Sequence, residues 1–129
     1  MYKGKTQLTR IWTVKPDGVE KMKENAESHT NWMKETHYKE GEKALLMLNW
    51  CMEKEKDEKG NETGNTLFVL TEVYETVAGV DDHFNQASET SVNFIPNDLA
   101  ELSLSLTACD RGKIINSLWW LKRGNYECK

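Results

Sequence analysis

Two histidines in one predicted helix are well suited to acid–base chemistry. His29, Met33 and His37 recur at steps of four residues, so they share one flank of a helix, and Trp32 lies beside them. A neutral imidazole can bind or deprotonate a phenol near pH 7, because histidine titrates close to that pH. The commoner structural alternative is that one histidine is a hydrogen-bonded buried group and the other caps the helix end.

The same two histidines are too far apart to bind one metal ion. Their separation corresponds to about 12 Å along a helix, at a rise of about 1.5 Å per residue. No pattern of carboxylates supplies further ligands. The cysteines Cys51, Cys109 and Cys128 have no C-x-x-C spacing, which indicates neither a zinc site nor a disulfide framework. We therefore expect no metal and no other cofactor.

Polar residues also interrupt the predicted strands. Glu72 lies within an apolar strand, and a lone buried charge is expensive, so we expect a structural pair with Arg10 from the neighbouring first strand. The functional alternative is that Glu72 is an acid in a pocket. Asn49 and Asn116 each interrupt an apolar strand face, and we expect them either to form hydrogen bonds across the sheet or to contact a ligand.

Hydrophobic periodicity predicts the elements that position these residues. Period-two alternation and apolar or β-branched runs predict strands over 7–15, 43–52, 66–75 and 113–121. Apolar residues spaced by three and four predict helices over 16–37, 77–88 and 98–109. The polar segment 53–65 is expected to be a loop at the tip of a hairpin.

This order of elements predicts an α+β fold in a single domain over residues 1–129. It matches a ferredoxin-like βαββαβ antiparallel sheet with helices on one face and an extra helix over 98–109 before the last strand. The second and last strands are apolar on both faces, and the chain has 5 tryptophans, Trp12, Trp32, Trp50, Trp119 and Trp120. Since the face without helices then needs a cover, we expect a homodimer.

Composition excludes several classes of partner. The net charge is -4 and the basic residues are scattered, so we expect no nucleic acid partner. No apolar run approaches the roughly 20 residues that cross a bilayer, so we expect no membrane span. The first residues lack the apolar core of a secretory signal, which favours a cytoplasmic location.

One segment resembles a known family. The run T-E-V-Y-E-T-V-A-G-V-D-D-H-F, in which Tyr74, Glu75, Thr76, Ala78 and His83 fall into the family pattern, resembles the antibiotic-biosynthesis-monooxygenase group of dimeric α+β barrel proteins. The resemblance implies a pocket between the helices and the sheet of each protomer. Known members use it for cofactor-independent oxygenation of aromatic compounds or for haem degradation. The first strand lacks the asparagine expected of the haem-degrading branch, so we expect no haem.

Two hypotheses about function follow, and the sequence does not decide whether the protein is catalytic. The first is a cofactor-independent oxygenase that uses His29, His37, His83 and Tyr74 around an apolar pocket. The second is a non-catalytic dimer that binds a small apolar or aromatic ligand, or a partner protein. Fold alone does not separate them, because one fold hosts many functions.

Overall fold

The computed structural model describes residues 1–89 and 97–118. Its elements are β1 (Thr6–Val14), a short 3-10 helix η1 (Pro16–Gly18), α1 (Val19–Thr36), β2 (Leu45–Lys56), β3 (Glu62–Tyr74), α2 (Val77–Glu89), α3 (Asn97–Ala100) and β4 (Ser103–Lys113). The predicted first three strands and first two helices are confirmed. Among the described residues, no helix is both long and apolar enough to cross a membrane.

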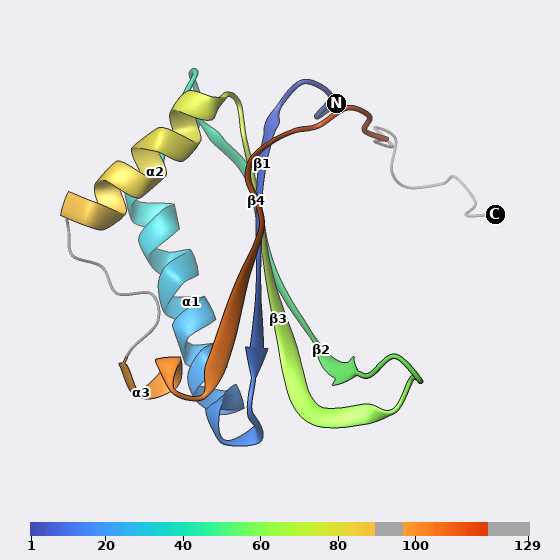
Figure 1. Cartoon of the computed structure of the whole chain (residues 1–129). Coiled ribbons are helices and arrows are strands. Elements are labelled where there is room, and N and C mark those ends of the chain that lie inside the picture. The colour runs from blue at the N-terminus through green and yellow to red at the C-terminus, as the bar shows by residue number, and fades with distance from the viewer. Residues whose placement is uncertain (90–96, 119–129) are drawn as a thin grey trace, which may run out of the picture.

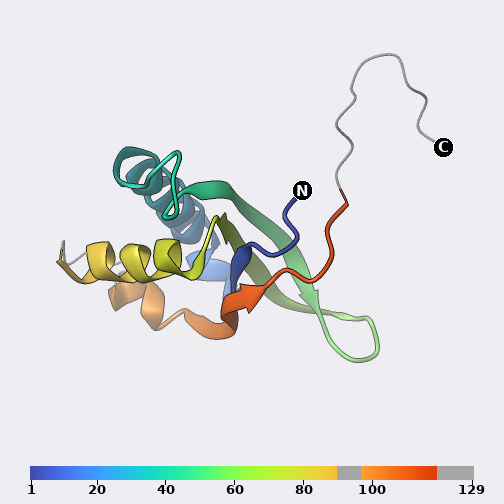
Figure 2. The same cartoon turned by 90° about the horizontal axis from the view of Figure 1, so that it is seen from above.

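The four strands form one antiparallel sheet in the order β2-β3-β1-β4. The helices of the described ranges all lie on one side of this sheet (Figure 1), and the view from above shows the same two layers (Figure 2). The fold is therefore α+β, as predicted. Its element order and strand order are compatible with a ferredoxin-like arrangement.

The core lies between the sheet and the two long helices. On β1 the buried residues alternate and include Leu8, Trp12 and Val14, because successive side chains of a strand point to opposite faces. On α1 the buried residues recur at spacings of three and four: Met22, Ala26, His29 and Met33. This is the apolar stripe expected for the first helix, so its histidine points into the molecule.

A glycine brings α2 close to the sheet. A Cβ on Gly79 would lie 2.5 Å from Cδ1 of Tyr74 and 3.0 Å from the carbonyl oxygen of Lys43. The missing side chain lets the first turn of α2 pack directly on the Tyr74 ring. His83 follows one helical turn later on the same face of α2 and is also buried.

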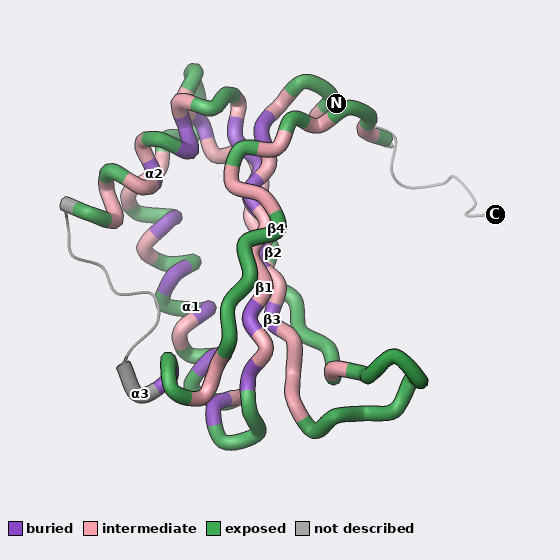
Figure 3. Tube along the Cα trace, viewed as in Figure 1, coloured by how far each residue is buried: buried purple, intermediate pink, exposed green. Residues whose placement is uncertain are grey.

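The segment expected to be a loop over 53–65 is mostly strand. β2 continues to Lys56 and β3 begins at Glu62, and the ladder between them continues through this exposed arm (Figures 1 and 3). The arm closes at Asp57, whose Oδ1 accepts hydrogen bonds from the backbone N–H groups of Lys59 and Asn61. Strand pairing uses backbone groups, so charged side chains do not prevent it.

The helix expected over 98–109 is also wrong. Only Asn97–Ala100 is helical, and Ser103–Lys113 forms β4, which pairs with β1. Leucines at 102, 104 and 106 alternate with small hydroxyl residues, and this period-two pattern prevails over the helical spacing. Of the strand expected over 113–121, Lys113 ends β4, residues 114–118 form no regular element, and 119–121 lie outside the described residues, as do Trp119 and Trp120.

Candidate functional site

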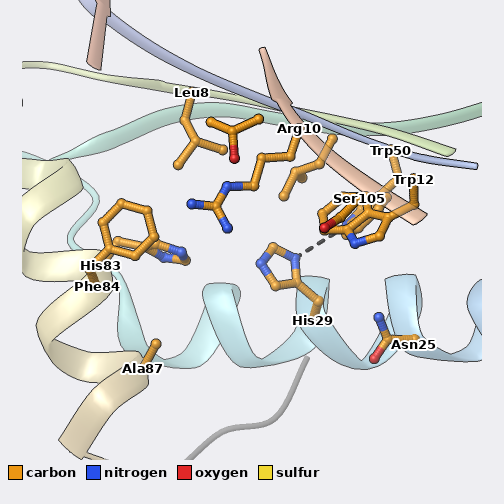
Figure 4. Close-up of a pocket in the computed structure, with 12 residues that line it drawn as sticks. Leu8, Arg10, Trp12, Asn25, His29, Trp50, His83, Phe84, Ala87 and Ser105 are labelled. Carbon is orange, nitrogen blue, oxygen red and sulfur yellow. Dashed lines mark hydrogen bonds between the residues drawn. The ribbon is translucent and has the colours of Figure 1, made fainter. Parts of the chain in front are cut away.

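A cavity of about 330 Å³ lies between the helices and the sheet (Figure 4). Its wall combines large apolar side chains with a few polar ones. The lining residues are Leu8, Arg10, Trp12, Asn25, His29, Trp50, Leu70, His83, Phe84, Ala87, Ser105 and Thr107. A largely apolar wall with a few convergent polar groups is typical of small-molecule sites.

His29 is held between a tryptophan and a carboxyl group. The indole Nε1 of Trp50 donates a hydrogen bond to His29 Nδ1 at 3.2 Å, drawn as the dashed line in Figure 4. His29 Nε2 lies 3.7 Å from Oε2 of Glu72. Because an indole N–H only donates, the Nδ1 atom accepts and the proton of the neutral ring is on Nε2. Burial lowers the pKa of His29 to about 4, with a smaller contribution from His37.

Glu72 is a buried carboxyl group with one unsatisfied oxygen. Its Oε1 accepts a hydrogen bond of 2.5 Å from the hydroxyl of Tyr74, and both side chains are fully buried. Its Oε2 has no hydrogen-bond partner among the described residues. Burial raises the pKa of Glu72 to about 7, although the Tyr74 hydroxyl and the charge of Arg10 oppose this shift. Burial also raises the pKa of the Tyr74 phenol.

A pair of histidines links the cavity to the end of α1. His83 lines the cavity and its Nδ1 lies 2.9 Å from Nε2 of His37. Nδ1 of His37 lies 2.9 Å from the hydroxyl oxygen of Thr36. Burial lowers the pKa of His83 to about 3 and also lowers the pKa of His37, which the charge of Asp82 partly opposes. Both rings are therefore neutral near pH 7.

The expected pair between Arg10 and Glu72 is not formed. Arg10 instead donates two hydrogen bonds of 3.1 Å to Asp110 on β4, and its guanidinium lies 5.2 Å from the centre of the Phe84 ring. Asp110 reaches Arg10 because β4 runs beside β1, which the helical interpretation of this segment did not predict. In Figure 4 the Arg10 side chain extends into the cavity, between His83 and His29.

The three buried groups His29, Glu72 and His83 also suit a metal ion by residue type. A donor atom from each lies within 4.8 Å of the others, and two histidines with one carboxylate bind zinc or iron in many proteins. A metal on His29 Nε2 would move the ring proton to Nδ1, where it would face the N–H of Trp50. Two donors would then oppose each other. The arrangement therefore favours a cluster that holds protons.

The structure brings most of the predicted site residues together. His29, His83 and Arg10 line the cavity. Glu72, Tyr74 and His37 contact these residues from behind, and the Trp32 ring lies 5.2 Å from that of His37 and 5.7 Å from that of His83.

The remaining three predicted residues lie elsewhere. Met33 is part of the core. Asn49 is exposed and pairs with Thr71. Both residues lie at strand positions that alternate with the more buried ones, so they face away from the helices. Asn116 is exposed beyond the end of β4. None of the three lines the cavity.

Several lining residues were missed by the sequence analysis. Trp12 and Trp50 form one wall, with ring centres 5.2 Å apart. The pairing of their strands could not be read from local patterns, although both residues lie on the apolar side of a predicted strand. Ser105 and Thr107 line the cavity from β4, and they were missed because this segment was expected to be a helix.

Comparisons of the chain with protein-family models, with curated proteins and with solved structures found no match. The family resemblance therefore depends only on the residues quoted for it. Of these, Tyr74 and His83 lie in the polar cluster beside the cavity, with ring centres 6.3 Å apart.

Proposed function

We propose that this protein is an enzyme that binds a small aromatic hydroxyl compound in the cavity, removes its hydroxyl proton and lets the resulting anion react with molecular oxygen. The observation that carries this proposal is the cluster of neutral, buried proton acceptors at the wall of an apolar cavity. A neutral imidazole beside a bound hydroxyl group is the arrangement that general-base catalysis requires. The family resemblance supports the same class of reaction.

The size and wall of the cavity define the ligand. Ligand pockets span roughly 300 to 1,000 Å³, so a cavity of about 330 Å³ fits a molecule of one or two rings. Trp12, Trp50 and Phe84 offer aromatic surfaces for a planar ligand. The guanidinium of Arg10 supplies positive charge for an oxyanion, since Asp110 occupies its Nε and Nη2 nitrogens and leaves Nη1 for a ligand.

The proposed reaction needs only the substrate and one molecule of oxygen. In 1-naphthol, loss of the hydroxyl proton raises the electron density of the ring carbon opposite the oxygen. Reaction there with one molecule of oxygen gives 1,4-naphthoquinone and one molecule of water. The substrate supplies four electrons: one oxygen atom enters the quinone and the other leaves as water. His83 acts as the base, and Arg10 stabilises the anion.

Oxygen uptake with 1-naphthol tests this function. The wild type should consume oxygen and form the quinone, identified by mass spectrometry. His83→Asn removes the base and should slow uptake by at least about 100-fold, the contribution typical of general-base catalysis. Tyr38→Phe, at an exposed position, is the matched control and should behave as wild type. Binding of 1-naphthol without any oxygen uptake would reject the enzyme in favour of the alternative, a ligand-binding protein.

We also propose that two copies of the chain pack through the sheet face that the helices leave open. On this face one row of apolar side chains crosses all four strands: Leu106, Ile11, Val69 and Cys51 are aligned by the strand register. Leu104 and Leu106 are 74% and 62% exposed in the single chain. An exposed apolar face of this kind marks an interaction surface. A two-fold dimer covers it with an identical face.

Light scattering across a dilution series checks the dimer. At micromolar concentration we expect twice the mass of one chain. Leu106→Lys places a charge within the apolar row of the proposed interface, and the variant should be a folded monomer. Lys59→Ala at the exposed hairpin tip is the control and should remain a dimer. A wild-type monomer at this concentration would contradict the proposal.

A further inference from the structure

A chain of hydrogen bonds leads from the cavity wall toward the end of α1. It runs from His83 on α2 to His37, the residue that caps α1, and then to Thr36. Unlike His83, which is 4% exposed, His37 is half-buried and does not line the cavity. The two rings therefore connect the cavity to a half-buried position near the protein surface.

The direction of each hydrogen bond follows from the last residue of the chain. The Thr36 hydroxyl donates to the carbonyl oxygen of Trp32 at 2.7 Å, so its oxygen accepts from Nδ1 of His37. The neutral His37 ring then has its lone pair on Nε2 and accepts from Nδ1 of His83. The basic nitrogen of the neutral His83 ring is accordingly Nε2.

The surroundings favour a positive charge on His37 over one on His83. Burial is the largest cause that lowers the pKa of His83, and the charges of His37, His29 and Arg10 lower it further. Among the described residues, the titratable groups near His37 include Asp82 and His83 from α2, Tyr74 from β3 and His29 from α1. Burial lowers the pKa of His37, and the charge of Asp82 opposes this shift. The Oδ1 atom of Asp82 lies 4.0 Å from the Lys43 ammonium group. His37 also lies at the C-terminal end of α1, where a helix stabilises a cation.

We propose that His83 and His37 act as one proton-accepting pair, in which a proton taken from the ligand at Nε2 of His83 leaves the positive charge on His37. The Nδ1 proton of His83 moves to Nε2 of His37 as the ligand proton binds, so no proton is lost or gained by the pair beyond the one taken. The reverse shift returns the proton to the reduced oxygen atom that leaves as water. This inference rests on the proposed function, since it requires a ligand with an acidic hydroxyl group in the cavity.

The probe for the experiment is 4-nitrophenol, whose anion absorbs visible light and whose neutral form does not. The binding is measured below the pKa of free 4-nitrophenol, by absorbance and by calorimetry in two buffers of different ionisation enthalpy. Calorimetry counts the protons released to solvent. We expect the wild type to bind the anion with almost no proton release, because the pair keeps the proton. The uncharged analogue 4-nitroanisole should bind with no proton linkage.

His37→Gln is the decisive variant. The glutamine oxygen can accept the same hydrogen bond from His83 but cannot take up a proton. The ratio of bound anion to bound neutral 4-nitrophenol should fall at least about tenfold, which equals a shift of about 1 unit in the pKa of the ligand. Binding of 4-nitroanisole should not change, and Tyr38→Phe should match the wild type throughout.

A second measurement does not depend on any variant. In the wild type, nitrogen-15 spectra of the imidazoles should show His37 protonated on both nitrogens with 4-nitrophenol bound, and neutral with 4-nitroanisole bound. The proposal is overturned if His37 stays neutral with the anion bound, or if His37→Gln keeps the same anion ratio; the proposed binding function then survives. Failure of both probes to bind overturns the proposed function and this inference together.

Discussion

The free energy of unfolding of Glu72→Gln is expected to rise relative to that of the wild type as the pH increases from about 5 to about 8. Burial raises the pKa of Glu72 from 4.5 to about 7. Below pH 4.5 the carboxyl group is protonated in both folded and unfolded chains. Between the two values only the folded chain keeps the proton, so the stability from this group is lost as the pH rises through about 7. The full shift corresponds to about 3 kcal/mol.

The histidines change stability with pH in the opposite direction at lower pH. This effect is the same in the wild type and in Glu72→Gln. The pKa values of His29 and His83 are lowered to about 4 and about 3. The unfolded chain therefore binds more protons below about pH 6.5, and both proteins lose stability as the pH falls through this range. The difference between Glu72→Gln and wild type removes this shared part and isolates the carboxyl group.

Denaturant unfolding at a series of pH values measures the difference. The free energies of unfolding of Glu72→Gln and wild type should diverge by about 3 kcal/mol between pH 5 and pH 8. Glu53→Gln, on the exposed part of β2, is the matched control, and its curve should run parallel to wild type. Parallel curves for Glu72→Gln as well would mean that the carboxyl group is not held in a buried site of this kind.

Replacing Trp12 by alanine is expected to reduce stability by about 3 to 5 kcal/mol, the range for a packed aromatic side chain. Trp12 is 6% exposed, packs with its ring centre 5.2 Å from that of Trp50 and belongs to the core cluster. It lies on β1 between Phe68 of β3 and Ser105 of β4. Loss of the indole therefore opens the core and one wall of the cavity together.

Denaturant unfolding in parallel with binding of 4-nitroanisole checks this expectation. Trp12→Ala should lose both stability and affinity for the probe. Met52→Ala, whose side chain is half-exposed, is the control, and it should change stability by no more than about 0.5 kcal/mol. An equal loss in the two variants would show that Trp12 has no special role in the core.

Apart from the strands of the hairpin arm over 53–65, the first two thirds of the fold could be predicted because its periodic patterns are unambiguous. The stripe of α1 that ends near Met33 fits only a helix, and the alternation in β1 fits only a strand. The segment after 97 satisfies two patterns at once. Leu99, Leu102 and Leu106 fit a helix, whereas the alternation around Ser105 fits a strand. Pairing with the free edge of β1 decides between them, and local sequence does not contain that information.

This one misreading also explains the main error at the site. Glu72 was correctly expected to be a buried carboxyl group that needs a partner. Arg10 was expected to be that partner because it lies on the neighbouring first strand, and the strand that carries Asp110 was not predicted. Once β4 lies beside β1, Asp110 pairs with Arg10, and Glu72 turns to Tyr74 on its own strand. Partners that come from distant segments could not be predicted from spacing.

The most direct test of the central claim is an NMR titration of the wild type with 1-naphthol that follows its 3 imidazole groups. We predict saturable shifts of His29 and His83, which line the cavity, with one ligand bound per chain. Ala87→Trp fills the cavity from α2 and should abolish the shifts, whereas Ala100→Trp, away from the cavity, should not. Absence of shifts in the wild type, or shifts that survive in Ala87→Trp, would contradict a ligand site between the helices and the sheet.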